Sequence, residues 1–396
     1  MSILKKVYIV PYGSFWLTAV YENDKLAEVY ADKAGSEGLL DRIYVGKVKT
    51  VVKNIDAAFI EIEGGIVGYY KIGDNKNPVF LNHKVSEKLV PGDEILVQVV
   101  KEGVKTKAPV LSSNISLSGR YAVLKSGRDF SAVSSKIEDE GRRQALLLLA
   151  QSHTEENIGF VVRTKAEAAD DASVADELGC LKAQYDEIVR KAHYLTCFSQ
   201  VYKAPPEYIE RIRQMADESL VKVSTDIGAV YDSIYGELSD LLGDRLVFYE
   251  DAQLDLIKLL SLETQLERLL SKKVWLKSGG FLVIEPTEAF VVIDVNTGRY
   301  TGKKTGEETF LKINMEAAEE IAKQLRLRNL SGIILIDFIN MKQPENKKML
   351  IETLKAEIAK DSVRTVFVDM TRLNIAELTR KKVRKPLYEQ LMGERT

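Results

Sequence analysis

Two runs of β-branched and apolar residues, each closed by an aspartate, constrain the fold of this chain more than any other feature. The first run ends at Asp294 and the second at Asp337. Runs of this kind are typical of parallel strands that are buried on both faces of a sheet. Between them, residues 307–328 carry apolar side chains at three- and four-residue spacing, which predicts an amphipathic helix. Strand, crossover helix and strand form a βαβ unit, so both aspartates should lie at the carboxyl edge of one sheet.

This edge is where open α/β sheets bind their ligands. Two carboxylates there can share a hard cation such as Mg²⁺, which prefers oxygen ligands and often contacts phosphates. A single aspartate at a strand end is as often a turn former or a helix N-cap. Two aspartates on one βαβ unit, with Asn296 close to the first, instead favour a metal-assisted phosphoryl-transfer site built from Asp294, Asn296 and Asp337.

The loop at residues 297–306 resembles a phosphate-binding glycine loop. Only three residues separate Gly298 from Gly302, where a Walker P-loop has four, and Lys303 is followed by a second lysine. An ATPase is therefore not expected, and a basic loop beside the metal site fits better. The three histidines show no partnering pattern, which disfavours a ribonuclease that uses two histidines as acid and base.

Composition sets broad limits on this chain. Its 396 residues suffice for two to four domains. No stretch reaches eighteen uncharged apolar residues and the first residues lead into a strand, so a cytoplasmic protein without a membrane span is expected. The cysteines, Cys180 and Cys197, match neither a disulfide framework nor a zinc knuckle, and should be buried, reduced thiols.

The net charge of −2 does not by itself indicate a nucleic-acid binder. Basic residues gather, however, near the end of the chain: Arg364, Arg372, Arg380, Lys381, Lys382, Arg384 and Lys385. Alone, such a cluster is more often a solvated surface, but its place after the acidic strands favours a surface for a phosphate backbone.

Residues 43–116 show short strands separated by glycine-rich turns, which predicts a small OB-type barrel. Phe59 and Tyr69 fall on strands that form an oligonucleotide-binding face in such barrels, with Lys107 nearby. Two core aromatics would explain the first two residues equally well. Farther along, Arg163 and Thr164 follow an apolar strand and suit either a turn or a phosphate pocket.

Several segments of the chain resemble the bacterial ribonuclease E/G family: residues 114–121, 162–164, 292–299, 314–328, 336–339, 370–372 and 378–384. The resemblance extends over nearly the whole chain in family order. It implies a multidomain α/β fold, with an RNase H-like region split between residues 1–37 and 206–270. This region is interrupted by an S1 (OB-fold) β-barrel at 38–116 and a 5′-sensor region at 117–205, and a DNase I-like α/β catalytic domain follows at 271–396.

The resemblance also implies a Mg²⁺-dependent endoribonuclease of RNA processing and decay, which cuts single-stranded, often A/U-rich RNA to 5′-phosphate and 3′-hydroxyl ends. It assigns the metal to Asp294 and Asp337, and the scissile phosphate to Asn296. The implied RNA-binding residues are Phe59, Tyr69, Lys107 and Arg372, and the implied sensor of a 5′-monophosphate consists of Gly119, Val123, Arg163 and Thr164. An RNA-binding protein that keeps the scaffold but cuts poorly is the alternative.

Three features depart from the family pattern. The family continues into a zinc-binding cysteine pair and a small dimerisation domain, whereas this sequence ends at Thr396, so the zinc-linked tetramer is not expected and another homo-oligomer stays open. Residues 163–167 lack the glycines that usually follow the sensor arginine. Asn340 stands where many members carry a third acid. The last two departures leave open whether 5′-end sensing operates and whether the metal affinity is altered.

Overall fold

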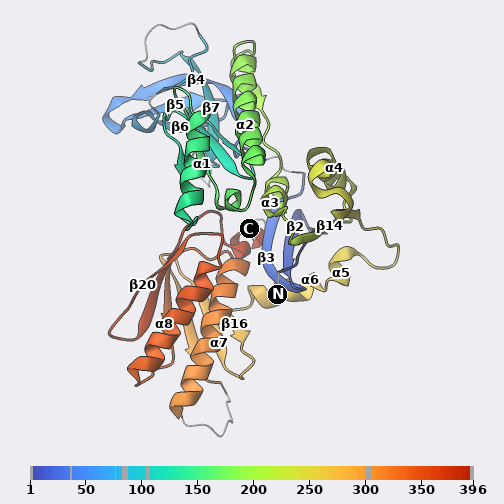
Figure 1. The fold of residues 1–396 in the computed structure, drawn as a ribbon, viewed down its shortest axis with the longest axis vertical. Coiled ribbons are helices and arrows are strands. Elements are labelled where there is room, and N and C mark those ends of the chain that lie inside the picture. Colours follow the sequence, from blue (N-terminus) through green and yellow to red (C-terminus); the bar gives the residue numbers. More distant parts are fainter. Residues whose placement is uncertain are drawn as a thin grey trace. The chain divides into compact units, whose positions relative to one another are not determined.

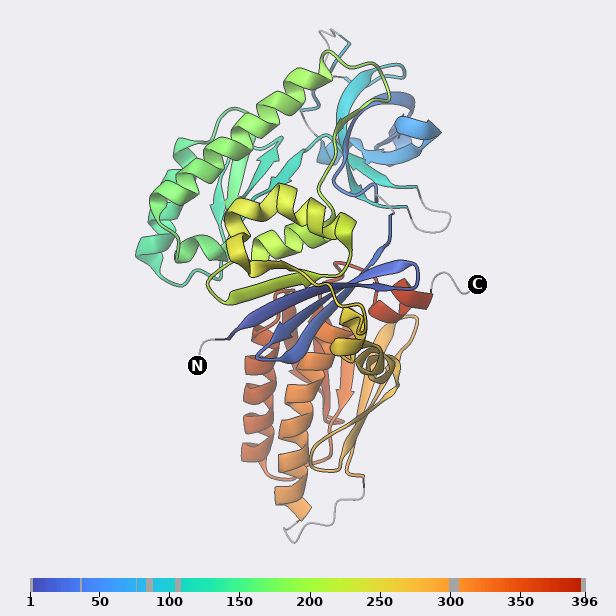
Figure 2. The same ribbon diagram turned by 90° about the vertical axis from the view of Figure 1, so that its right-hand side faces the viewer.

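The structure is a computed structural model that describes residues 3–35, 38–75, 77–82, 88–103, 108–298 and 306–392 (Figures 1 and 2). The chain divides into two compact units. The first comprises Met1–Ser36 and Met215–Thr396, and the second comprises Glu37–Gln214. Among the helices within the described residues, none is long and apolar enough to cross a membrane.

The C-terminal part of the first unit is built on a six-stranded sheet in the order β16-β17-β18-β19-β21-β20. The strands are β16 Lys273–Trp275, β17 Phe281–Pro286, β18 Phe290–Asn296, β19 Gly332–Asp337, β20 Thr365–Met370 and β21 Ile375–Arg380. Strands β18 and β19 are parallel and are joined by α7, Gly306–Leu327. The predicted βαβ unit is therefore confirmed.

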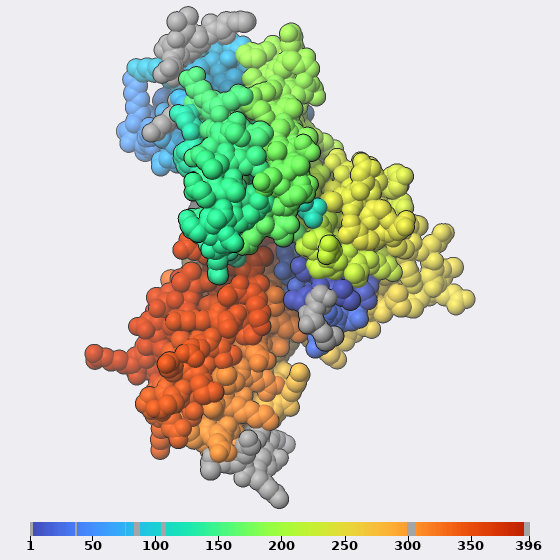
Figure 3. Space-filling view, viewed as in Figure 1, coloured from blue at the N-terminus to red at the C-terminus, as the bar shows by residue number. Residues whose placement is uncertain are grey.

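Helices cover one face of this sheet. Helix α7 and helix α8, Pro344–Ala359, pack on it through a shared core, and Figure 2 shows both helices on the same side of the strands. Figure 3, drawn from the helix side, shows their atoms covering the sheet. Along β18, Val291, Ile293 and Val295 are buried, whereas Phe290 and Val292 are 42% and 37% exposed. The prediction that these strands are buried on both faces is wrong, because the described helices pack on one face of the sheet and side chains of the other face are exposed.

The N-terminal sheet of the same unit has the order β15-β14-β1-β2-β3. Its strands are β1 Lys5–Tyr12, β2 Phe15–Glu22, β3 Lys25–Lys33, β14 Leu220–Thr225 and β15 Leu246–Phe248. Strands β1, β14 and β15 are parallel, whereas β1, β2 and β3 form antiparallel hairpins. Asn23 and Asp24 both have positive φ, at 48° and 61°, as a tight two-residue hairpin turn requires.

Helices α4 Gly228–Leu242, α5 Leu256–Leu259, α6 Leu262–Leu270 and α9 Leu387–Met392, together with the end of α7, complete this part of the unit. Side chains of α5 and α6 pack on the sheet in a core that also contains Leu327 of α7 and Leu387 of α9. This core therefore joins the N-terminal sheet to the end of α7, the helix that covers the six-stranded sheet.

A closed barrel forms one half of the second unit. Its strands are β4 Ile43–Val52, β5 Ala57–Glu61, β6 Val67–Lys71, β7 Glu94–Lys101 and β8 Val110–Ser112. The strand order β4-β5-β6-β8-β7 closes through pairing of β7 with β4, and β13, Gln200–Tyr202, adds to the other edge of β4. The predicted OB-type barrel is confirmed.

The other half of the second unit is a four-stranded sheet in the order β11-β12-β10-β9. Its elements are β9 Ser116–Ser118, β10 Ala122–Ser126, β11 Ala132–Val133, β12 Ile158–Val162, α1 Glu140–Ser152 and α2 Asp171–Ala192, and α3 Glu207–Met215 leads back to the first unit. Both cysteines are free thiols, but Cys180 is exposed and Cys197 is half-buried. The expectation of buried thiols is wrong because Cys180 lies outside the apolar stripe of α2 that contains Leu178 and Leu181.

Candidate active site

Asp294 and Asp337 lie directly opposite each other. They are register partners on the neighbouring parallel strands β18 and β19, and both side chains are exposed. Adjacent strands are about 4.8 Å apart, so the two carboxylates extend over the same small region of the uncovered face. The structure thus brings together the two acids that the sequence pattern singled out.

Asn296 lies on the same face as Asp294, because residues two apart on a strand point to the same side. Its Nδ2 donates a hydrogen bond of 2.7 Å to Oδ2 of Asp294. This bond fixes the orientation of both side chains. It leaves the second Asp294 oxygen and the Asn296 carbonyl oxygen as further oxygen groups at the site.

No basic side chain among the described residues offsets the charge of the two carboxylates. Partial burial and the neighbouring charge of Asp294 together raise the pKa of Asp337 above its ordinary value. Within the part of the chain that the structure describes, neither carboxylate forms an ion pair with a lysine or arginine. Two adjacent oxygen donors without a basic partner suit a hard divalent cation.

The donor set fits Mg²⁺ better than a transition metal. No group of three or more histidine, cysteine, aspartate or glutamate side chains gathers anywhere in the described ranges. Mg²⁺ is commonly held by one or two carboxylates, with water and phosphate oxygens completing its octahedron. A pair of exposed carboxylates is therefore a sufficient protein contribution.

Arg372 lies in the exposed turn that precedes β21. Ile375, the first residue of β21, is the register partner of Asp337, so this turn lies at the aspartate end of the sheet. Asn340 is engaged in the same turn, where its Oδ1 accepts a 2.7 Å hydrogen bond from Asn374. The Asn340 amide thus bonds to this turn.

One member of the predicted basic cluster has a structural role. Arg380 is only 4% exposed, and its Nε donates to Oδ2 of Asp361 at 2.8 Å. Its Nη1 donates to Asn329 and to the carbonyl of Leu330. The inclusion of Arg380 in a phosphate-binding surface is wrong, because its guanidinium is buried and donates its hydrogen bonds to groups inside the protein.

Phe59 and Tyr69 are register partners on β5 and β6 of the barrel. Their rings lie 6.2 Å apart at 74°, and both are partly exposed. The flanking residues Ala58 and Tyr70 are buried, so the aromatic pair lies on the outer face of the barrel. The alternative that they are core aromatics is wrong. Lys107 lies outside the described residues.

The four predicted sensor residues gather around β10 and β12. Val123 of β10 pairs with Ser118, and the Oγ of that serine accepts a 3.1 Å hydrogen bond from Nη2 of Arg163. Burial lowers the pKa of Arg163 from its ordinary value. Thr164, at the start of the next turn, shares a 2.9 Å hydrogen bond with Ser134.

Gly119 starts a turn that Glu177 of α2 holds in place. The backbone N–H groups of Arg120, Tyr121 and Ala122 all donate to the Glu177 carboxylate. A Cβ on Gly119 would lie 2.3 Å from that carboxylate, so a side chain does not fit there. Three successive N–H groups of this kind can bind an anion. Here the protein's own carboxylate, that of Glu177, occupies them.

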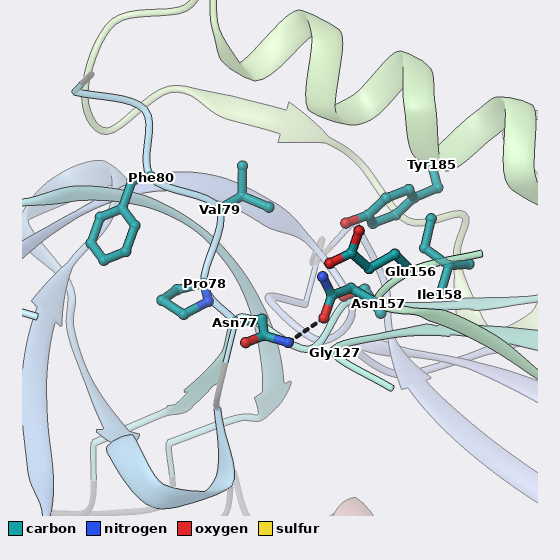
Figure 4. A pocket seen from close by; sticks show the side chains of 10 residues that line it. Asn77, Pro78, Val79, Phe80, Gly127, Glu156, Asn157, Ile158 and Tyr185 are labelled. Carbon is teal, nitrogen blue, oxygen red and sulfur yellow. Dashed lines mark hydrogen bonds between the residues drawn. The ribbon is translucent and has the colours of Figure 1, made fainter. Parts of the chain in front are cut away.

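A separate pocket of about 370 Å³ lies in the second unit (Figure 4). Asn77, Pro78, Val79 and Phe80 form one wall, and residues from β10, β12 and α2, including Tyr185, form the other. A hydrogen bond between Asn77 and Asn157 crosses it. None of the predicted site residues lines this pocket.

Comparison with known proteins places the chain in a family. The model of the Ribonuclease E/G family matches residues 116–383, a region that contains both aspartates and the four residues predicted to form a sensor. The chain belongs to the ribonuclease E/G family. The family resemblance predicted from the sequence is therefore confirmed.

Relatives in this family align along most of the chain. Ribonuclease G of Escherichia coli K12 is 30% identical over 382 residues, covering 93% of this chain and 78% of the relative. Ribonuclease G of Haemophilus influenzae is 33% identical over 390 residues, covering 95% and 79%. Ribonuclease E of Synechocystis is 34% identical over 392 residues, covering 96% of this chain and 57% of that longer protein.

Two residues of this ribonuclease E/G family member position the site but were given no role from the sequence. Asn314 of α7 is fully buried and bonds to the backbone just after β19. Glu316, half a turn later, accepts hydrogen bonds from the backbone N–H groups of Lys277 and Ser278, in the turn between β16 and β17. Helix α7 therefore anchors the chain on both sides of the aspartates. A polar residue inside the apolar stripe of the helix was the available signal for Asn314.

Proposed function

We propose that this protein is an endoribonuclease that cleaves single-stranded RNA with Mg²⁺ held between Asp294 and Asp337. One observation carries the proposal: the two carboxylates are register partners on an uncovered sheet face, with Asn296 bonded to the first. The relatives are named as ribonucleases G and E, which supports RNA as the substrate.

The site residues would have different roles. Asp294 and Asp337 would hold the cation, and a bound Mg²⁺ would lower the pKa of its water and offset charge on the phosphate. Asn296 fixes the Asp294 carboxylate through their hydrogen bond and is available to orient the scissile phosphate. Hydrolysis by water would leave 5′-phosphate and 3′-hydroxyl ends. No protein nucleophile is required.

Other residues would bind the RNA. Phe59 and Tyr69 offer partly exposed rings for base stacking, which tolerates any base sequence. Arg372 would contact the phosphate backbone beside the cation. Arg163 and Thr164 would receive a 5′-monophosphate. We further propose A/U-rich substrates, a role in cytoplasmic RNA processing and decay, and RNase H-like and DNase I-like origins for the two sheets of the first unit.

A cleavage assay tests the proposal. The substrate is a 5′-monophosphorylated, A/U-rich single-stranded oligoribonucleotide, with Mg²⁺ or with EDTA, and the DNA of the same sequence is the substrate control. Asp294→Asn should abolish cleavage, whereas Asp232→Asn, an exposed aspartate of α4, should not. Binding without cleavage by the wild type would replace the enzyme with an RNA-binding protein on the same scaffold.

The sensor part is tested separately. Arg163→Ala should slow cleavage of the 5′-monophosphorylated RNA about tenfold, since a charge-assisted hydrogen bond is lost, and should leave the 5′-hydroxyl RNA nearly unchanged. Equal losses on the two substrates would remove the sensor from the proposal.

A further inference from the structure

An exposed aromatic pair lies at the β16 end of the six-stranded sheet. Trp275 ends β16 and Phe281 begins β17, and the two are register partners. Their ring centroids are 5.3 Å apart with 60° between the planes. Trp275 is 63% exposed, although tryptophan is highly buried on average. Exposure of so large an apolar ring suggests a binding role.

This pair shares the uncovered face with the aspartates. Val274 and Leu282, the neighbours of Trp275 and Phe281, pack into the core beneath α7, so the two aromatic side chains point the other way. Phe281 is in turn the register partner of Asn296. Trp275, Phe281 and Asn296 therefore form one row across three strands. At the usual strand spacing, the Cα atoms of Trp275 and Asn296 are roughly 10 Å apart.

A lysine completes the group. Lys273 lies two residues before Trp275 on the same face, and its Nζ is 4.0 Å from the Trp275 ring centroid and 3.6 Å from that of Phe281. Val283, the register partner of Lys273, is also the partner of Asp294. The backbone of Lys273 thus lies in the row of Asp294, and its ammonium group reaches to the aromatic pair in the next row. Aromatic rings beside a basic group are how proteins bind single-stranded nucleic acid.

Other exposed apolar residues lie elsewhere on the uncovered face. Phe290, Val292 and Ile333 are exposed and apolar, and they lie in rows farther from the carboxyl end of β18 and β19. Nothing in the structure shows what covers them. The aromatic pair differs because it has a cation against its rings and lies in register with Asn296.

We propose that Trp275, supported by Phe281 and Lys273, stacks on a base of the substrate RNA close to the scissile phosphate. The proposal rests on the proposed function, because it assumes that RNA crosses this face of the sheet. It gives the first unit its own base contact, in addition to Phe59 and Tyr69 of the barrel. Since every base has a stacking face, the contact strengthens binding without selecting a sequence. Lys273 would then face the phosphate backbone.

Abasic substrates test this contact. An RNA with one cleavage site is prepared as a series in which a single nucleotide near that site lacks its base. Wild type should lose about tenfold in kcat/KM at one position of the series, mainly through KM. Trp275→Ala should already have the tenfold lower kcat/KM on the intact RNA. Removing the base at the sensitive position should lower its kcat/KM no further. Trp275→Phe should retain most of the contact.

A matched control separates this contact from a general effect of losing an exposed ring. Tyr235 of α4 is 59% exposed, and Tyr235→Ala should leave kcat/KM unchanged. Circular dichroism melting curves check that each variant is folded. The proposal is overturned if a folded Trp275→Ala protein cleaves the intact RNA with the kcat/KM of the wild type. It is also overturned if the variant loses as much kcat/KM as the wild type at every abasic position. Cleavage by the wild type would still stand.

A binding measurement gives a second readout without cleavage. The chain has two tryptophans, Trp16 and Trp275, so Trp16→Phe leaves Trp275 as the only indole. In that protein, combined with Asp294→Asn to prevent cleavage, the RNA oligonucleotide should quench the indole fluorescence as it saturates. RNA binding seen by anisotropy with unchanged Trp275 emission would overturn the stacking contact. Quenching together with an inactive wild type would support the contact and reject the proposed enzyme.

Discussion

Asn314 of α7 forms two hydrogen bonds with the backbone of Ile339. Its Nδ2 donates to the Ile339 carbonyl at 2.8 Å, and the Ile339 N–H donates to its Oδ1 at 3.0 Å. The crossover helix thereby fixes the chain two residues after Asp337. The same helix holds the turn beside Asn296 through Glu316, so one element positions both sides of the candidate site.

Asn314→Leu is expected to destabilise the protein by about 2–4 kcal/mol, because the partly buried backbone N–H and carbonyl groups of Ile339 lose their partners. Cleavage by the remaining folded protein should need more Mg²⁺, since the Asp337 end of β19 is no longer held. Urea unfolding and a Mg²⁺ titration of the cleavage rate measure the two effects. A stable variant with an unchanged Mg²⁺ requirement would show that Asn314 does not position the site.

Gly298 follows the strand that carries Asp294 and Asn296. Its φ is +61°, and a Cβ there would lie 2.2 Å from the carbonyl oxygen of Gly279. Gly298→Ala should therefore lower the unfolding free energy by about 1–3 kcal/mol and reduce kcat, because the strand end must shift. Gly332→Ala is the control, since that glycine also has positive φ but has open space around it. Equal losses of kcat in both variants would show that the close approach of Gly298 to Gly279 does not position the strand end.

Arg380 and Arg372 should behave in opposite ways. Arg380→Met leaves Asp361 buried without its partner, and breaking such a pair costs about 3–5 kcal/mol of stability. Arg372→Ala removes an exposed charge, so stability should stay within about 0.5 kcal/mol while RNA binding weakens about tenfold at low salt. Thermal unfolding and anisotropy binding curves test both. A reversed pattern would show that the two arginines are assigned wrongly.

Ionisation of Tyr70 in the barrel should destabilise the protein at alkaline pH. Burial raises its pKa to about 12, and its hydroxyl shares a 2.8 Å hydrogen bond with Ser113. An unfolded tyrosine titrates near pH 10, so the stability is fully present below that pH and is lost as the pH rises toward 12. The loss is about 2–3 kcal/mol. Between pH 9 and pH 12, the unfolding free energy measured in urea should fall less steeply with pH for Tyr70→Phe than for the wild type. Equal slopes would show that Tyr70 does not cause the loss of stability.

The sequence pattern was sufficient to predict the βαβ unit, the barrel and the meeting of Asp294 with Asp337. These features follow from local periodicity and from the geometry of a parallel crossover. The uncovered face of β18 was not predictable in this way, because it depends on which distant helices pack on the sheet. The burial of Arg380 has the same cause. Its partner Asp361 lies 19 residues away, and no local pattern marks a buried ion pair.

The most direct test of the account is the Mg²⁺ dependence of RNA cleavage by the wild type and by Asp337→Asn. The two carboxylates form one proposed cation site, so the wild-type rate should rise to saturation with Mg²⁺ and vanish with EDTA. Asp337→Asn should be inactive or should require far more Mg²⁺. Wild-type cleavage that persists in EDTA, or a superimposable Mg²⁺ curve for Asp337→Asn, would contradict it.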